Sequence, residues 1–183
     1  MVILRPTKKL RSLLPTVAVS TQSDTALGDW YVNRIVVERQ PLLLLVSSTS
    51  LLSVVMPARD VRSLPDRLGA VVASRLRRFG IEPQAIEAEL QAMHPVIVAP
   101  TVDRSVLGTM VDLAKGVRYY SGDLRTDRGL AGLEDWLAET PCRSGLPYDR
   151  VVFPADKAPD LLRTTWLANS PLQLTSGTKV VVP

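Results

Sequence analysis

Hydrophobic residues in this chain fall into short runs, separated by polar and turn-forming residues. Runs that are rich in β-branched and aromatic residues are typical of strands. The pattern predicts strands at residues 2–4, 30–39, 42–47, 51–56 and 96–99. The segment 30–39 has no clean polar face, so we expect both of its faces to be largely covered. Because short links join the strands between residues 30 and 56, they are expected to form an antiparallel meander.

Apolar residues at helical spacing follow the meander. Leu64, Leu68 and Val72 recur every four residues, and Gly80 provides a stop signal. Similar spacing, bounded by capping residues or prolines, predicts helices at residues 8–14, 63–80, 83–94, 103–120, 130–138 and 158–167. The sequence therefore predicts an α+β fold, in which an antiparallel sheet (a meander) packs against helices on one face.

Glycine and proline interrupt the pattern after residue 120. We predict that residues 1–120 form an α+β core domain and that residues 121–183 form a C-terminal extension packed on the same domain. Residues 150–153 are expected to form an edge strand. The β-prone residues 179–182 predict either a closing strand or part of a mobile tail.

The scarcity of cysteine and histidine limits the chemistry. The chain has one of each, Cys142 and His94, whereas a zinc site needs several thiolates or imidazoles. Only His94 could serve a histidine-dependent triad, and it stands at a helix end before Pro95. No glycine-rich phosphate loop or dinucleotide fingerprint is present. We therefore predict no metal and no cofactor, although carboxylate or magnesium chemistry stays open.

The apolar runs are also too short for a membrane protein. None approaches the roughly 20 residues that cross a bilayer, and the N-terminus lacks the charge order of a signal peptide. A single cysteine permits no internal disulfide. These features predict a bacterial cytoplasmic protein with no membrane partner, the bacterial origin being a guess from the arginine-rich composition.

Charge is unevenly distributed along the chain. Residues 1–80 contain 12 basic and 5 acidic residues, a net charge of +7, and residues 81–183 contain 10 and 13, a net charge of −3. A basic N-terminal half favours a polyanionic partner such as nucleic acid. The alternative is an arginine-rich surface that faces only solvent.

Three polar blocks are candidates for a site. In the first, Lys8 and Lys9 follow Thr7 between a predicted strand and a predicted helix. A helix N-terminus offers free N–H groups and a partial positive charge, which adjacent lysines reinforce for anion binding. The alternative is a capped helix with solvated lysines.

The second block runs from residue 24 to residue 33. Asp29 can accept backbone hydrogen bonds in a tight turn that Gly28 supplies. Trp30 and Tyr31 point to opposite faces of a strand, so one is expected in the core and the other at a site. Asn33 lies on the Tyr31 face and has polar atoms for a pocket. The alternative is a structural corner with one exposed aromatic ring.

The third block, residues 101–110, joins a strand end to a helix start. Asp103 can cap the helix or bind a cation, and Arg104 can grip a carboxylate or phosphate with two hydrogen bonds. Ser105 lies beside them, and Gly108 interrupts the helix. The alternative is a capping residue and a glycine that permits close packing.

These blocks carry a resemblance. The chain resembles a family of uncharacterised bacterial proteins, a domain of unknown function, that share Thr-Lys-Lys-Leu, Leu-Gly-Asp-Trp-Tyr-x-Asn and Asp-Arg-Ser-Val-Leu-Gly-x-Met. The similarity covers roughly residues 1–120 and transfers no mechanism. It implies one candidate ligand-binding surface formed by Lys8, Asp29, Trp30, Asn33, Asp103, Arg104 and Ser105, to which Lys9 is added from the first block.

The favoured function is a non-catalytic binding or regulatory module that engages nucleic acid or a protein through its basic N-terminal half. The alternative is a small enzyme for a phosphate-bearing or nucleotide-like substrate, with Asp29 or Asp103 as a base or magnesium ligand. A third reading is an assembly subunit. The sequence leaves catalysis and the oligomeric state open.

Overall fold

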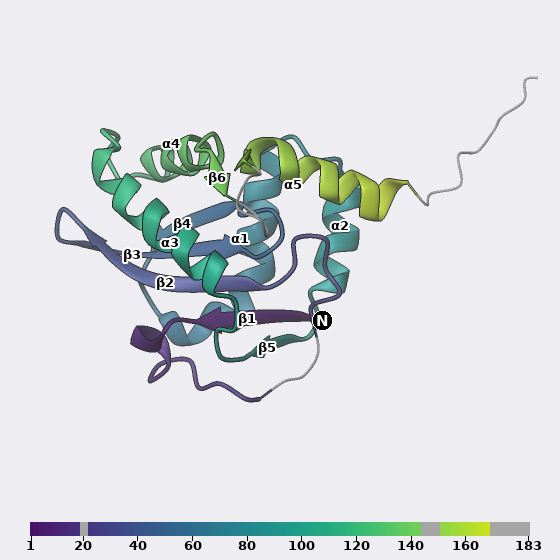
Figure 1. Cartoon of the computed structure of the whole chain (residues 1–183), viewed down its shortest axis with the longest axis horizontal. Helices are drawn as coiled ribbons and strands as arrows, with labels where there is room; N and C mark the ends of the chain where they lie inside the picture. Colours follow the sequence, from purple (N-terminus) through teal and green to yellow (C-terminus); the bar gives the residue numbers. More distant parts are fainter. Residues whose placement is uncertain (19–21, 144–150, 169–183) are drawn as a thin grey trace, which may run out of the picture.

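The computed structural model describes residues 1–18, 22–143 and 151–168, and shows a five-stranded sheet in the order β4-β3-β2-β1-β5 (Figure 1). Its strands are β1 (Val2–Pro6), β2 (Trp30–Val37), β3 (Gln40–Ser47), β4 (Ser53–Pro57) and β5 (Val96–Val98). Strands β2, β3 and β4 form the expected antiparallel meander. The fold is α+β, but the sheet is mixed, because β1 pairs in parallel with both β2 and β5.

The prediction of a purely antiparallel sheet is therefore wrong. Parallel neighbours need a long connection rather than a tight turn, and both parallel pairs have one. More than twenty residues separate β1 from β2, and three strands and two helices lie between β1 and β5. No local pattern in the sequence specifies how strands joined by such long segments will pair.

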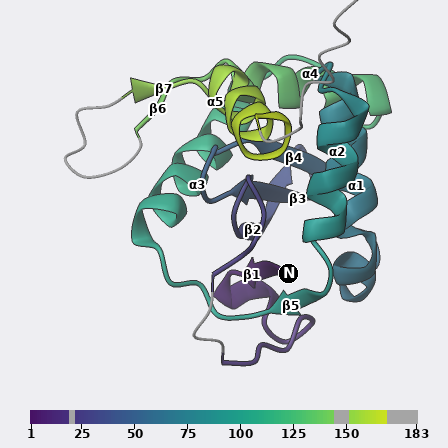
Figure 2. The same cartoon turned by 90° about the vertical axis from the view of Figure 1, so that its right-hand side faces the viewer.

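Helices cover both faces of the sheet, so the prediction of one covered face is also wrong (Figure 2). One face packs against α1, α2 and α5, and the other packs against α3 and α4. These helices are α1 (Leu64–Arg78), α2 (Pro83–Ala92), α3 (Arg104–Gly116), α4 (Asp127–Ala138) and α5 (Pro154–Leu162). The cause lies in strands such as β3, in which Leu43 and Leu45 enter one core while Leu44 and Val46 enter the other.

Short elements complete the described chain. They are the 3-10 turns η1 (Lys8–Leu10), η2 (Val61–Ser63) and η3 (Val117–Tyr119), the π-helical turn η4 (Arg163–Leu167) and the two-stranded ladder of β6 (Cys142–Arg143) and β7 (Val151–Val152). The predicted strand at residues 179–182 lies outside the described residues. No helix in the described ranges is long and apolar enough to cross a membrane.

Two buried carboxylates tie the C-terminal helices to the sheet. Glu134 of α4 accepts a hydrogen bond of 2.7 Å from the backbone N–H of Val55 in the edge strand β4. It also forms ion pairs with Arg75 and Arg78 of α1, and Arg75 bonds Asp135 at 2.5 Å. Basic residues of the N-terminal half are thus partly neutralised by acidic residues of the C-terminal half, inside the fold.

The second carboxylate, Glu89 of α2, holds the turn that precedes β2. It accepts hydrogen bonds from the backbone N–H groups of Ala26 at 2.9 Å and Leu27 at 3.1 Å, and from the Trp166 indole at 2.8 Å. All three donors are neutral, so burial of the charge raises the pKa of Glu89. The turn is anchored from two sides, as a structural corner requires.

Candidate functional site

The three polar blocks contact one another near the carboxyl end of β1 (Figure 1, left). The Thr7 hydroxyl donates to Asn33 Oδ1 at 3.0 Å, which joins the first block to the second. The backbone N–H of Asp103 donates to the Tyr31 hydroxyl at 3.0 Å, which joins the second to the third. Because β1 and β5 are parallel neighbours, the segments that follow them emerge at the same end of the sheet. Sheets of α/β proteins commonly bind ligands at the carboxyl ends of their strands.

A buried ion pair between Arg5 and Asp29 stabilises this arrangement. The guanidinium of Arg5, a residue only 4% exposed, donates through Nε to Asp29 and through Nη1 to the carbonyl of Pro100 at 2.5 Å. The Ser23 hydroxyl donates to the other oxygen of Asp29 at 2.5 Å. Both oxygens of the Asp29 carboxylate are therefore occupied, and Asp29 acts as a structural partner of Arg5.

Arg5 has no local signal in the sequence, because an arginine within an apolar strand resembles a residue at the edge of a sheet. Its register opposite Tyr31 places it on the α3 face of the sheet, between β2 and the loop that enters α3. The sequence therefore predicts Asp29 as a ligand-binding residue, whereas in the structure Asp29 is a structural partner of Arg5.

Both adjacent aromatic residues are buried, so the expectation of one exposed ring is wrong. Trp30 has 0% exposure and lies in the core beneath α1 and α2, where it presents no surface to a ligand. Tyr31 lies in the opposite core, and burial raises the pKa of its phenol. Helices on both faces of β2 explain why neither ring reaches solvent.

The third block acts first as a helix cap. Asp103 Oδ1 accepts from the backbone N–H groups of Ser105 at 2.7 Å and Val106 at 3.3 Å, as an N-cap residue does. Asp103 and Arg104 are exposed and Ser105 is half-buried. Arg104 forms no ion pair with any acidic residue in the described part of the chain.

The first block differs from its prediction. The expected helix at residues 8–14 is only a three-residue 3-10 turn, η1, and Thr7 makes no side-chain cap. Thr7 instead bonds Asn33, while Leu10 and Leu14 turn inward to the core. Lys8 and Lys9 are exposed, but no extended helix stands behind them to strengthen anion binding.

Other cations, which sequence reasoning missed, emerge at the same end of the sheet. The relevant segments are residues 7–9 after β1, residues 34–40 of the β2–β3 hairpin and residues 58–62 after β4. They contain six exposed cations against two acidic residues, Glu38 and Asp60. We call these six cations the basic end, and they are Lys8, Lys9, Arg34, Arg39, Arg59 and Arg62. None forms an ion pair with an acidic residue among those that the structure describes.

The hairpin between β2 and β3 carries Arg34 and Arg39 past the end of β1. Glu38 and Arg39 both have positive φ, 49° and 66°, which two-residue hairpin turns favour for their twist. Pro6 pairs with Val32, so β2 continues five residues beyond the end of β1. At about 3.3 Å per residue, the hairpin projects roughly 16 Å past β1.

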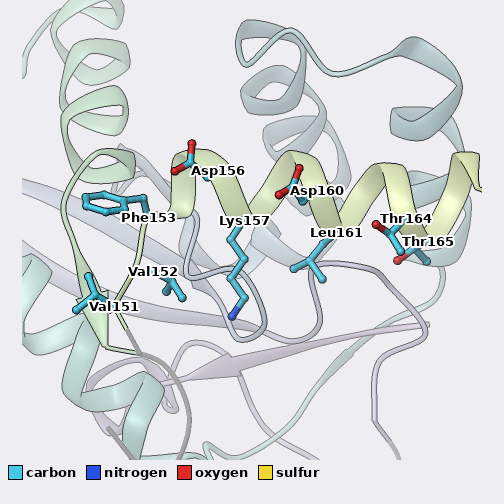
Figure 3. A pocket seen from close by; sticks show the side chains of 9 residues that line it. All are labelled: Val151, Val152, Phe153, Asp156, Lys157, Asp160, Leu161, Thr164 and Thr165. Carbon is cyan, nitrogen blue, oxygen red and sulfur yellow. The ribbon is translucent and has the colours of Figure 1, made fainter. Parts of the chain in front are cut away.

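A cavity of about 430 Å³ lies elsewhere, between β7 and α5 (Figure 3). Lys157 and Leu161 point to one side of α5 there, and Asp156 and Asp160 to the other. None of the predicted site residues lines this cavity, whose lining is Val151, Val152, Phe153, Asp156, Lys157, Asp160, Leu161, Thr164 and Thr165. Over the described ranges, no group of three or more metal-ligating residues comes together.

Comparison with known proteins identifies the family of this chain. A family model described as Domain of unknown function (DUF6933) matches residues 3–157, so the chain belongs to that family. The match continues beyond residue 120, where the resemblance of the three blocks ended, and includes α4 and the first residues of α5. No curated protein matches the chain. Membership therefore brings no activity with it, and the site must be interpreted from its own geometry.

Proposed function

We propose that this member of the DUF6933 family is a non-catalytic binding module that engages nucleic acid through the basic end of its sheet. The observation that carries the proposal is the collection of six exposed cations at one end of the sheet, on three segments, with no acidic partner among the described residues. Surface cations that are not neutralised within the fold are available to phosphates.

The internal ion pairs sharpen the argument from charge. The excess of basic residues in the N-terminal half includes Arg5, Arg75 and Arg78, and all three bind acidic residues inside the protein. These residues therefore contribute little to an external partner. Nine other basic residues remain in this half, and six of them form the basic end, so the charge is concentrated at one place on the surface.

The size of the basic end suits a chain of phosphates better than a single one. Its members lie on η1, on the projecting hairpin and around η2, which are separate elements. Double-stranded DNA carries a negative charge about every 1.7 Å along its axis, so cations spread over a hairpin of roughly 16 Å can contact several phosphates together. Contacts of this kind give affinity without reading the base sequence.

The alternative, an enzyme that uses a carboxylate as base or magnesium ligand, has less support. Both oxygens of Asp29 accept hydrogen bonds within the fold, and one oxygen of Asp103 caps α3. A general base needs a carboxylate within reach of its substrate. We therefore favour binding without catalysis.

Fluorescence anisotropy with labelled single- and double-stranded oligonucleotides of mixed sequence tests the proposal. At low salt the protein is expected to bind both, and Lys9→Glu, Arg34→Glu and Arg59→Glu are each expected to weaken binding several-fold. Arg77→Glu is the matched control, because Arg77 is an exposed cation of α1 outside the basic end.

Two results would contradict the proposal. The first is no binding of either oligonucleotide at low salt by a folded protein. The second is an equal effect of all four charge reversals, since this would reflect net charge rather than a defined surface. Binding of an acidic protein with no binding of oligonucleotides would point to the other class of partner.

A further inference from the structure

Gly108 occupies an unusual position in the middle of α3. It is exposed, and a Cβ added there would meet no atom within 4 Å. The packing role that we expected for it is therefore absent among the described residues. Glycine is among the poorest helix formers, and the packing of the described residues gives no reason for its use here.

The outward face of α3 is not purely polar. Its inner face buries Val106, Met110 and Leu113. The outer face exposes Val111, at 49%, in the turn after Gly108. Just beyond the two ends of the helix, Val102 is 69% exposed and Tyr119 is 85% exposed.

Figure 2 shows α3 at the left-hand margin of the molecule, on the side of the sheet away from α1 and α2. Exposed apolar side chains mark interaction surfaces when they are contiguous, and a glycine lets another backbone approach closely.

We propose that this face pairs with the α3 helix of a second copy of the chain, in an antiparallel arrangement centred on Gly108. The charges select this partner. Arg104 stands four residues before Gly108 and Asp112 stands four residues after it, and both are exposed. In an antiparallel pair these positions lie at equal heights, so each Arg104 meets Asp112 of the second copy, and the contact occurs twice.

The same charges disfavour a parallel pair. In that arrangement Arg104 would face Arg104 and Asp112 would face Asp112, and like charges repel. Asp112 also bonds Lys115 within its own helix at 3.1 Å, but both side chains are largely exposed, so this bond leaves room for a second cation. The long side chain of Arg104 would cross Val111 of the second copy to reach it.

The length of α3 sets the strength that we expect. A helix of 13 residues is about 20 Å long, and one helix against another forms a small interface. The dimer should therefore be weak and depend on concentration. The pairing face excludes the basic end, so the two proposals can be tested independently. A dimer would present two basic ends to one nucleic acid.

Sedimentation velocity over a series of concentrations tests the inference with three charge variants of the full chain. The wild type is expected to shift from monomer to dimer as concentration rises. Arg104→Asp and Asp112→Arg should each abolish the shift, because each places like charges in contact. The double variant R104D/D112R should restore the shift, since the pair is then reversed.

A size variant provides an independent check. Gly108→Leu should also abolish dimer formation, because the added side chain blocks close approach, while the open space around Gly108 leaves the monomer folded by circular dichroism. A wild type that stays monomeric at every concentration would overturn the inference. So would a dimer that survives the single charge reversals, or a double variant that stays monomeric.

Discussion

Gly28 sets the turn before β2 through its backbone and through its lack of a side chain. Its φ of +73° lies in the left-handed region that other residues rarely adopt. An added Cβ would come closer than van der Waals contact to the hydroxyl oxygens of Ser48 and Thr49. Both effects act on the residue that leads directly to Asp29 and the buried ion pair.

We therefore expect Gly28→Ala to lower the free energy of unfolding by about 2 kcal/mol or more, from strain and overpacking together. Urea denaturation measures this loss. Gly80→Ala is the matched control, because Gly80 has a φ of +70° but nothing within 4 Å of an added Cβ. It should cost only the backbone strain, about 1 kcal/mol. Equal losses for the two variants would show that the hydroxyl groups do not crowd this turn.

Glu89 gives a second prediction at the residue scale, on pH dependence. Burial raises its pKa in the folded protein above the ordinary value of 4.5. A group with a raised folded pKa contributes stability that is fully present below the unfolded pKa and is lost as pH rises through the folded pKa. The contribution of Glu89 should therefore fall as pH increases above about 4.5.

Glu89→Gln removes this titration and serves as the reference. Urea denaturation at a series of pH values should show the wild type losing stability relative to the variant as pH rises. A difference that stays constant, or that changes in the opposite direction, would contradict the account. The measurement is specific because the described donors that face Glu89, two backbone N–H groups and the Trp166 indole, do not titrate in this range.

At the scale of elements, a substitution at the start of α3 is expected to lower stability without weakening oligonucleotide binding. Asp103 caps the helix, so Asp103→Ala should lower the free energy of unfolding by about 1 kcal/mol. Its carboxylate adds nothing to the basic end, and removing one negative charge should leave oligonucleotide affinity unchanged or slightly higher. Denaturation and anisotropy on the same samples check both parts. A large loss of affinity without a loss of stability would make Asp103 a ligand rather than a cap.

Helices and strands were predictable where one local signal dominated. The apolar run in β3 and the spacing of Leu64, Leu68 and Val72 in α1 led to elements close to those observed. The expected helix at residues 8–14 failed because tertiary contacts outweighed its weak local preference. Thr7 bonds Asn33 instead of capping, and the segment bends inward at Leu10. The parallel pairing of β1 had no local signal at all.

At the scale of the whole molecule, the candidate site was partly predictable. The three polar blocks do contact one another, since Thr7 meets Asn33 and Tyr31 meets Asp103. Sequence alone could not show that Asp29 is engaged by Arg5, because that depends on the parallel pairing of β1 with β2. Sequence alone also could not show that cations from three distant segments lie at the same end of the sheet, because their placement depends on the sheet topology.

The central claim is that phosphates bind at the basic end, and the salt dependence of affinity tests it most directly. For duplex DNA, the logarithm of the binding constant falls against the logarithm of salt concentration by about 0.9 for each phosphate that is neutralised. We predict a clear negative slope for the wild type, a slope about one unit smaller for Arg34→Gln or Arg59→Gln, and an unchanged slope for Arg77→Gln. A wild-type slope near zero, or the same slope in all four proteins, would contradict the account.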